Sequence, residues 1–393
     1  MVIGIVCEFD PLHRGHARLL SHARALGADT VVCAMSGSFT QRGSFAALSK
    51  TARAEMAVRC GADLVLELPT LWAMSPAENF ARGGVQLLTL AGADALLFGS
   101  ECGDLPALQR LAACLDSPAF SAALAAAPDE GDTFAARRQS VAASLLDADT
   151  ASLLQSPNNT LAVEYLRALR HIGSPAVPYT LRRAGAAHDG APDGDTASAS
   201  YLRTLLRQGR GEEAAAFMPP PAAAVLRREL SAHRLTDEAL CQRAILSRLR
   251  TMTVEDWQTY DPGGEGLCRR MHRAAATACT VEGLLTAAKT KRYPLSRLRR
   301  MVLSAYLHLP PVPPEVPYLR VLAATPSGRA HLRALRDSGA PVLTKPADAA
   351  ALGASAASLF ALESRCTDLY VLARPDLTQA TPAQDYRATP LML

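Results

Sequence analysis

The chain has 393 residues, which at roughly 150 residues per domain predicts two or three domains and enough chain to bury a core. Apolar residues make up 49% of it and charged residues 20%, a balance that excludes a disordered or fibrous protein and is typical of a globular one. The net charge of +4 is too small to predict a nucleic-acid partner, so the distribution of charge must decide that question.

The cysteine content and the apolar runs bear on the compartment and on metal binding. Nine cysteines include no C-x-x-C pair and no short Cys/His spacing of the zinc type, so we expect reduced thiols and no metal site. The first residues lack a basic stretch ahead of an apolar one, and no later apolar run is long enough for a bilayer. We therefore expect a cytoplasmic protein with neither a membrane nor DNA as a partner.

Short apolar runs without polar alternation, most of them followed directly by an amphipathic helical pattern, fill the first third of the chain. Such runs are typical of parallel strands buried between two layers of helices. We predict an α/β fold in which residues 1–217 form a domain with a doubly wound parallel sheet. The expected strands are Val2–Phe9, Thr30–Ser36, Leu64–Leu68, Ala95–Ser100 and, after a helical stretch, Ala176–Leu181.

Two proline-rich breaks divide the rest of the chain. The first, Met218–Pro221, follows a loop rich in Gly, Asp and Ala at residues 185–196, and beyond it residues 222–310 have helical patterns throughout and predict a mostly helical domain. The second, Pro310–Pro317, precedes a strand–helix–strand–helix pattern. We expect residues 317–393 to form a small C-terminal α/β lobe or to dock on the first sheet.

The most informative motif, Asp10-Pro-Leu-His13-Arg-Gly15-His16, stands where the first strand ends and the first helix begins. Sheets of this class bind phosphates there, because the N-terminus of the helix offers N–H groups and a partial positive charge. Gly15 would let the backbone approach a ligand, and the imidazoles of His13 and His16 can donate to phosphate oxygens. The alternative is a chance match, since His22 shows that histidines are not scarce nearby. The strand–turn–helix context favours a nucleotide site, so we predict that residues 1–217 form a nucleotide-binding catalytic domain.

The His-x-Gly-His pattern in this context resembles the HIGH-type signature of nucleotidylyltransferases and class I aminoacyl-tRNA synthetases, which displace pyrophosphate in line at phosphorus. Further blocks in the same order, from residue 2 to about 325, are similar to a narrower family, the bacterial tRNA(Met) cytidine acetate ligases. These blocks are Met35–Gly43, Lys50 with Arg53, Gly61–Pro69, Phe98–Glu101, Ser156–Asn159, Ser198–Arg203 and Lys289–Tyr293.

The resemblance implies an ATP-dependent enzyme that activates acetate as acetyl-adenylate and releases pyrophosphate. The acetyl group would then pass to N4 of the wobble cytidine of elongator tRNA(Met), giving N4-acetylcytidine. ATP is expected as a substrate and acetate and tRNA(Met) as the other reactants, with Mg²⁺ accompanying ATP and no dedicated protein site for the metal. The fold implied is the HIGH-type Rossmann-like domain.

Carried over by position, the resemblance assigns His13 and His16 to catalysis and a larger set to ATP. Gly99 has a plain turn as its alternative and Asn158 a helix N-cap, while the two arginines of the set can be merely solvated. The assigned ATP-binding residues are Val6, Cys7, Glu8, Phe9, Asp10, Pro11, Leu12, His13, Arg14, Gly15, His16, Ala17, Arg18, Leu19, Gly99, Asn158, Arg182 and Arg183.

Residues near the ends of the second and third strands are candidates for the rim of the site. We assign Gln41, Arg42 and Lys50 to substrate phosphate or acetate, with an exposed helix start as the alternative for Lys50. Glu67 can orient a ligand or Mg²⁺, or it can pair with an arginine.

Six cations lie within twelve residues of the helical region, and no Asp or Glu occurs between Gly283 and Pro314. This basic segment, Lys289–Arg300, predicts salt-dependent contacts to tRNA phosphates, and Tyr293 within it can stack a splayed base. The alternative is a solvated helix face with Leu298 turned inward, and both can hold at once. The predicted tRNA-binding residues are Lys289, Lys291, Arg292, Arg297, Arg299 and Arg300.

Three other functions fit part of the sequence. A nucleotidylyltransferase with a small-molecule acceptor explains the histidines and Gly15 but leaves the helical region and the basic segment without a role. A class I tRNA synthetase needs a KMSKS-like lysine loop, which is absent unless Lys289–Arg292 replaces it. A non-catalytic RNA-binding protein would use the basic segment and keep the nucleotide fold as a scaffold.

Overall fold

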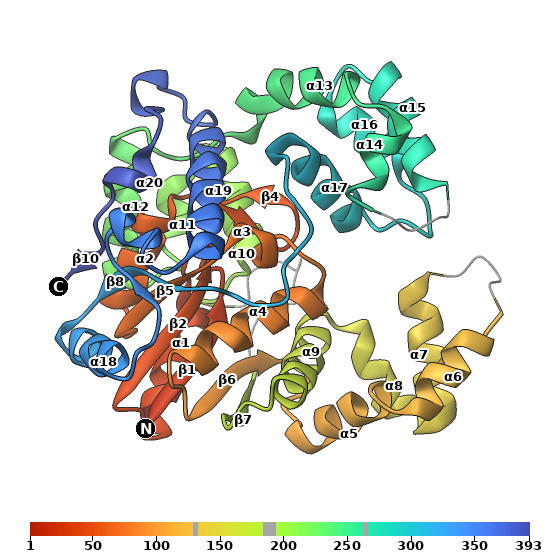
Figure 1. Cartoon of the computed structure of the whole chain (residues 1–393), viewed down its shortest axis with the longest axis horizontal. Helices are drawn as coiled ribbons and strands as arrows, with labels where there is room; N and C mark the ends of the chain where they lie inside the picture. The colour runs from red at the N-terminus through yellow and green to blue at the C-terminus, as the bar shows by residue number, and fades with distance from the viewer. Residues whose placement is uncertain (129–132, 184–193, 262–265) are drawn as a thin grey trace.

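The computed structural model describes residues 1–128, 133–183, 194–261 and 266–393 (Figure 1). Within these residues the central sheet has eight strands in the order β10-β8-β5-β2-β1-β6-β7, with β9 paired to β8. The five strands from β5 to β7 are parallel and have the Rossmann order, so the predicted doubly wound sheet is confirmed. The strands are β1 (Val2–Cys7), β2 (Thr30–Ser36), β5 (Leu64–Leu68), β6 (Ala95–Ser100), β7 (Val177–Arg182), β8 (Leu319–Ala324), β9 (Val342–Leu343) and β10 (Leu391–Met392).

Helices cover both faces of the sheet, because alternate residues of the buried strands are apolar toward each side. Ile3 and Ile5 of β1 belong to the core under one layer, whereas Val6 packs against Gly84 in the other. The first layer contains α1 (Arg14–Ala25), α2 (Lys50–Arg59), α10 (Ala199–Arg207), α11 (Gly211–Ala215) and α12 (Pro220–Ser231). The second contains α3 (Thr70–Ala73), α4 (Ala77–Leu90), α9 (Pro157–Ile172), α18 (Pro326–Asp337) and α19 (Ala354–Val371).

Two groups of helices project from the same side of the sheet, as Figure 1 shows at the lower and upper right. The lower group comes between β6 and α9 in the chain. It consists of α5 (Leu105–Leu115), α6 (Pro118–Ala126), α7 (Phe134–Leu145), α8 (Ala148–Ser152) and η1 (Leu153–Gln155). The upper group, called here the helical body, packs around the fully buried Trp257. It consists of η2 (Glu238–Cys241), α13 (Gln242–Arg250), α14 (Val254–Gln258), α15 (Leu267–Thr277), α16 (Val281–Ala288) and α17 (Leu295–Leu307).

A short antiparallel hairpin between β2 and α2 is absent from the sequence prediction. Its strands are β3 (Phe39–Thr40) and β4 (Ser44–Phe45), and Gly43 takes a φ of +72° in the turn. Two-residue strands leave no room for the alternation that marks a strand in a sequence. The hairpin is held from outside by aromatic contacts, among them Phe45 stacked on Tyr370 with ring centroids 6.1 Å apart.

Two predicted domain boundaries need correction. The helical domain does not begin at residue 222, because α12 packs on α2 and buries Val225 and Leu226 in the core beside β1. Residues 317–393 do not form a lobe of their own, because β8 pairs antiparallel with β5 and extends the first sheet, which was the second expectation for this segment. The segment also contains η3 (Pro346–Ala349), η4 (Leu377–Gln379) and α20 (Gln384–Arg387).

Two further expectations concern the loop at residues 185–196 and the absence of membrane-spanning segments. The loop predicted at residues 185–196 lies outside the described residues except for its last three positions. Within the described part of the chain, the structure contains no helix with the length and apolar character needed to cross a membrane.

Candidate active site

A cavity of about 350 Å³ opens at the carboxyl ends of β1 and β6, where sheets of this class bind their ligands. Its wall combines the loop after β1, the hairpin, α4, α9, the end of β7 and the start of α10. The lining residues are Val6, Cys7, Glu8, Phe9, Asp10, His13, His16, Leu19, Thr40, Gln41, Arg42, Ala77, Phe80, Phe98, Gly99, Pro157, Asn158, Thr160, Leu161, Tyr165, Arg183, Ser198, Ala199, Ser200 and Arg203.

The two histidines of the motif stack on each other with ring centroids 3.8 Å apart. His13 is the N-cap of α1, and its Nδ1 accepts a hydrogen bond from the Gly15 N–H at 3.1 Å. Nδ1 of His16 accepts one from the His13 N–H at 3.4 Å. A ring nitrogen that accepts carries no proton, so these contacts assign the proton of each neutral ring to Nε2.

Both imidazoles are neutral near pH 7. Burial, with smaller contributions from Arg183 and Arg203, lowers the pKa of His13 to about 3. Burial also lowers the pKa of His16 well below its usual value, with His13 and the same arginines contributing. The histidines therefore offer Nε2–H donors near neutral pH, while the positive charge of the site comes from the lining arginines Arg42, Arg183 and Arg203.

Gly15 has a different role from the predicted one. A Cβ at this position would lie 2.9 Å from Cε1 of His13, so the glycine makes room for the imidazole ring rather than for a ligand. The expected free N–H groups at the start of α1 are also corrected. The Arg14 N–H donates to the Phe217 carbonyl at 3.1 Å, and the Gly15 N–H is taken by His13. The N–H groups of Arg14 and Gly15 are therefore not available to an anion.

Arg203 of α10 is another arginine that lines the cavity, together with Arg183. Its Nη1 donates to the Asp10 carbonyl at 2.8 Å and lies 3.8 Å from Oδ2 of the Asp10 carboxylate. Its Nη2 donates to Oγ of Ser200 at 3.1 Å. The sequence analysis gives Arg203 no role, although this residue ends the matching block Ser198–Arg203. The feature that could have identified it is its place five residues after Ser198, the N-cap of α10.

The hairpin enters the cavity wall through Gln41 and Arg42. The Gln41 N–H donates to Oε1 of Glu8 at 2.7 Å, and burial raises the pKa of the Glu8 carboxyl group. The lining also contains the aromatic rings of Phe98 and Tyr165, which are tilted against each other at a centroid distance of 5.7 Å. Aromatic surface beside polar groups suits a nucleobase.

The chain is similar to known proteins over most of its length. The chain matches the family model described as HIGH Nucleotidyl Transferase over residues 1–385. It is 39% identical over 352 residues to the tRNA(Met) cytidine acetate ligase of Syntrophotalea carbinolica, covering 85% of this chain and 82% of that protein. It is 33% identical to the protein of the same name from Caldanaerobacter subterraneus, covering 94% and 95% of the two chains. The chain belongs to the tRNA(Met) cytidine acetate ligase family.

Solved structures agree with this family assignment. The crystal structure of Thermotoga maritima TmcAL in its apo form superposes with a TM-score of 0.94 at 28% identity, covering 100% of this chain and 99% of that one. The same protein bound with alpha-thio ATP superposes with a TM-score of 0.92. The similarity extends over both helical groups and the C-terminal segment, so the whole architecture belongs to the family.

In this member of the tRNA(Met) cytidine acetate ligase family, only part of the predicted ATP set lines the cavity. Arg14 points away and pairs with Asp195 at 2.9 Å, and Arg18 lies 3.8 Å from the same carboxylate. Arg182 lies outside the lining and packs on Gly103, because successive side chains of β7 alternate between faces. From the predicted set, the cavity contains Val6, Cys7, Glu8, Phe9, Asp10, His13, His16, Leu19, Gly99, Asn158 and Arg183, but not Pro11, Leu12, Arg14, Gly15, Ala17, Arg18 or Arg182.

Asn158 and Gly99 both line the cavity. Ser156, not Asn158, is the N-cap of α9, and Nδ2 of Asn158 donates to Oε1 of Glu101 at 2.7 Å. Glu101 also accepts the Asn159 N–H at 2.7 Å, so its carboxylate neutralises the start of α9. Gly99 lies within β6 rather than in a turn.

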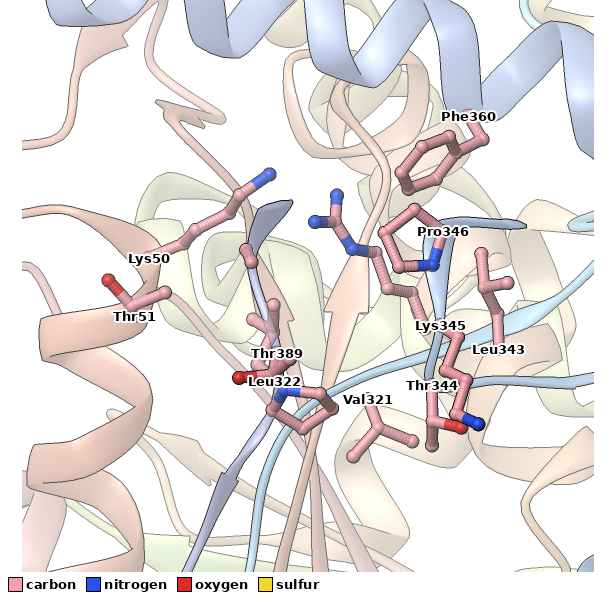
Figure 2. Close-up of a pocket in the computed structure, with 13 residues that line it drawn as sticks. Lys50, Thr51, Val321, Leu322, Leu343, Thr344, Lys345, Pro346, Phe360 and Thr389 are labelled. Atoms are coloured by element: carbon pink, nitrogen blue, oxygen red, sulfur yellow. The ribbon is translucent and has the colours of Figure 1, made fainter. Parts of the chain in front are cut away.

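Lys50 is not at the rim of this cavity. It lies beside a separate cavity of about 20 Å³, shown in Figure 2 with Lys50 on one side and Phe360 and Pro346 on the other. Its Nζ donates to Oε1 of Glu67 and Oδ2 of Asp385, each at 2.7 Å. Arg320 pairs with the same two carboxylates at 2.8 and 2.9 Å, which confirms the arginine-pairing alternative for Glu67. Lys50 therefore belongs to a buried ion-pair network, and it is no longer a candidate for contact with the substrate.

The basic segment is only partly available to a ligand. Lys289 and Lys291 are exposed, and Arg292 and Arg299 are half-buried. Arg297 is paired with Asp261 at 2.6 and 2.9 Å and stands over the ring of Tyr293, and Nη1 of Arg300 donates to the Gln41 carbonyl at 3.1 Å. Tyr293 is only 5% exposed, so the expectation that it stacks a base is wrong.

Proposed function

We propose that this protein is an ATP-dependent ligase that activates acetate as acetyl-adenylate and acetylates N4 of the wobble cytidine of elongator tRNA(Met). The supporting observation is the arrangement of two neutral imidazoles and three guanidinium groups, those of Arg42, Arg183 and Arg203, around one cavity at the end of β1. Such a site holds a triphosphate in place and stabilises departing pyrophosphate, and membership in the family supplies the acceptor.

In the first step a carboxylate oxygen of acetate attacks the α-phosphorus, and the bond to the bridging oxygen of pyrophosphate breaks. The Nε2–H groups of His13 and His16 donate to phosphate oxygens as charge builds on them, and Arg183 and Arg203 neutralise the leaving group. Gln41 and Arg42, which also line the cavity, are proposed to hold the acetate carboxylate. This chemistry requires position and charge, so no protein nucleophile is needed.

In the second step the N4 amine attacks the acetyl carbon, and AMP leaves from the mixed anhydride while the amine loses a proton. Acetate alone has no good leaving group and the exocyclic amine is a poor nucleophile, so prior activation solves both problems. The exposed lysines of the basic segment, Lys289 and Lys291, are proposed to contact tRNA phosphates together with Arg292 and Arg299.

Mg²⁺ is proposed to arrive with ATP, where it would neutralise charge on the phosphates. Within the described residues, no group of three or more His, Cys, Asp or Glu side chains can hold a metal ion. The carboxylates of Glu8 and Asp10 line the cavity, and each already accepts a backbone N–H through one oxygen. This fits Mg²⁺, which commonly takes one or two carboxylates and fills its other positions with phosphate and water.

The test is to incubate the protein with ATP, Mg²⁺, labelled acetate and unmodified elongator tRNA(Met), and to digest the RNA. Labelled N4-acetylcytidine at the wobble position, with AMP and pyrophosphate formed, is the expected product. A tRNA with uridine at that position is the control and takes no label. If no label enters the RNA while ATP still binds, the proposal fails and a nucleotidylyltransferase with a small acceptor takes its place.

His13→Ala tests the assignment of the first step. Removing an Nε2–H donor aimed at developing charge is expected to lower acetate-dependent ATP–pyrophosphate exchange by about 100-fold or more. His22→Ala is the matched control, because His22 stands on the same helix outside the cavity lining. Near-normal exchange in His13→Ala would contradict the role given to this ring.

A further inference from the structure

The helical body and the active-site cavity meet at the hairpin. Gly43 in its turn packs directly on the backbone of α17, where an added Cβ would lie 2.6 Å from the Arg300 nitrogen and 2.7 Å from the Arg299 carbonyl carbon. With φ at +72°, this position also disfavours any side chain on conformational grounds. The hairpin is therefore fitted closely against the basic segment.

Gln41 is held from both sides by contacts that join these two regions. Its N–H donates to Glu8, which follows β1 in the cavity wall, at 2.7 Å. Its carbonyl accepts from Nη1 of Arg300 in the helical body at 3.1 Å. Thr40, Gln41 and Arg42 all line the cavity, so the two contacts fix the part of the hairpin that faces the substrate.

We propose that Arg300 is a positioning residue for acetyl-adenylate formation rather than a tRNA contact, because it clamps the Gln41 carbonyl and so sets where Gln41 and Arg42 stand in the cavity. The inference rests on the proposed function and reassigns one cation of the basic segment. Through the same contact, the helical body, which carries Lys289 and Lys291 in the loop between α16 and α17, is tied to the wall of the ATP cavity.

The physical case for Arg300 is that the hairpin cannot hold this position alone. Its strands have two residues each, and an isolated hairpin of any length is marginal in water. A hydrogen bond from a charged donor is stronger than a neutral one, and it acts here on the residue next to Arg42. Burial and the neighbouring Arg297 lower the pKa of Arg300 to about 10, so the guanidinium stays charged at neutral pH.

The experiment compares Arg300→Met with wild-type protein in two assays. Acetate-dependent ATP–pyrophosphate exchange without tRNA is expected to show a KM for acetate raised roughly 10- to 100-fold, because the residues that hold acetate are displaced. The affinity for tRNA(Met), measured by filter binding, is expected to stay near the wild-type value. Arg329→Met, an exposed arginine on α18, is the matched control and changes neither quantity.

Two further variants separate positioning from a general loss of structure. Arg300→Lys keeps one donor and is expected to recover part of the KM for acetate. Gly43→Ala forces the hairpin away from α17 without removing a cation and is expected to raise the same KM with tRNA affinity kept. Lys291→Ala is the comparison for a lost phosphate contact and should weaken tRNA binding.

The inference is overturned if Arg300→Met weakens tRNA binding as Lys291→Ala does while the KM for acetate stays unchanged. It is also overturned if Gly43→Ala leaves that KM unchanged in a protein with a wild-type melting temperature. These outcomes differ from failure of the proposed function, in which wild-type protein itself shows no acetate-dependent exchange.

Discussion

The two stacked histidines make the stability of the protein depend on pH. The pKa of His13 falls from 6.5 in an unfolded chain to about 3 in the folded one, so between these values the unfolded state binds a proton that the folded state does not. Stability must therefore decrease as pH falls through this window, and His16, whose pKa is also depressed, acts in the same direction.

The expected size of this effect is measurable. Lowering the pH from about 7.5 to about 5.5 should cost about 1.4 kcal/mol at His13 alone. Urea unfolding over this pH range is the measurement, with His13→Asn as the variant because asparagine can still cap α1. The slope for His13→Asn should be shallower than for wild type and for the control His22→Asn. Parallel curves for all three would contradict the depressed pKa.

Sequence pattern located the histidines but could not assign what surrounds them. The strand–turn–helix context was enough to place His13 and His16 at a phosphate site. The tautomers, the neutral charge state and the true role of Gly15 depend on ring packing and on partners such as Phe217 and Arg203, which are about 200 residues away in the chain. Local patterns contain no information on such contacts.

At the scale of elements, the buried network of Lys50, Glu67, Arg320 and Asp385 joins the C-terminal segment to the sheet. Lys50 comes from α2, Glu67 from β5, Arg320 from β8 and Asp385 from α20, and all four are less than 7% exposed. Two cations face two carboxylates, so the network is balanced only when it is complete. Removing one partner leaves a buried charge without compensation, which is the costly case.

Lys50→Met is therefore expected to lower the free energy of unfolding by about 3 kcal/mol or more. The measurement is urea denaturation at neutral pH. The control is Lys345→Met, an exposed lysine at the edge of the same small cavity, which should cost little. Adding Asp385→Asn to Lys50→Met should recover part of the loss, because the uncompensated charge is removed. Additive losses in the double variant would exclude the coupling.

The same network shows what the sequence could and could not predict of the fold. The buried strands stood out as apolar runs, and each predicted strand is observed to within two residues at either end. The pairing of β8 with β5 joins residues about 250 positions apart, and nothing local in Leu319–Ala324 chooses between a separate lobe and the edge of the first sheet. The choice depends on tertiary contacts, such as the ion pair between Arg320 and Glu67.

At the scale of the whole molecule, a net charge of +4 says little because cations are locally concentrated and many are paired. Within the basic segment, Lys289 and Lys291 are exposed, whereas Arg297 forms a two-point ion pair with Asp261. Only a cation that exchanges its counterions for a tRNA phosphate contributes to the salt dependence of binding. The distribution of pairing, rather than the number of arginines, thus decides the electrostatics of tRNA recognition.

Salt titrations of tRNA(Met) affinity test this distinction. Lys289→Ala and Lys291→Ala should each reduce the slope of log K against log salt by roughly 0.7 to 0.9, the value for one lost phosphate contact. Arg297→Ala should leave the slope unchanged, because its charge is already compensated within the helical body, and should instead lower the stability of that body. If Arg297→Ala reduces the slope as much as Lys289→Ala does, then the pair with Asp261 opens when tRNA binds, and the accessible surface is wider than the unbound structure presents.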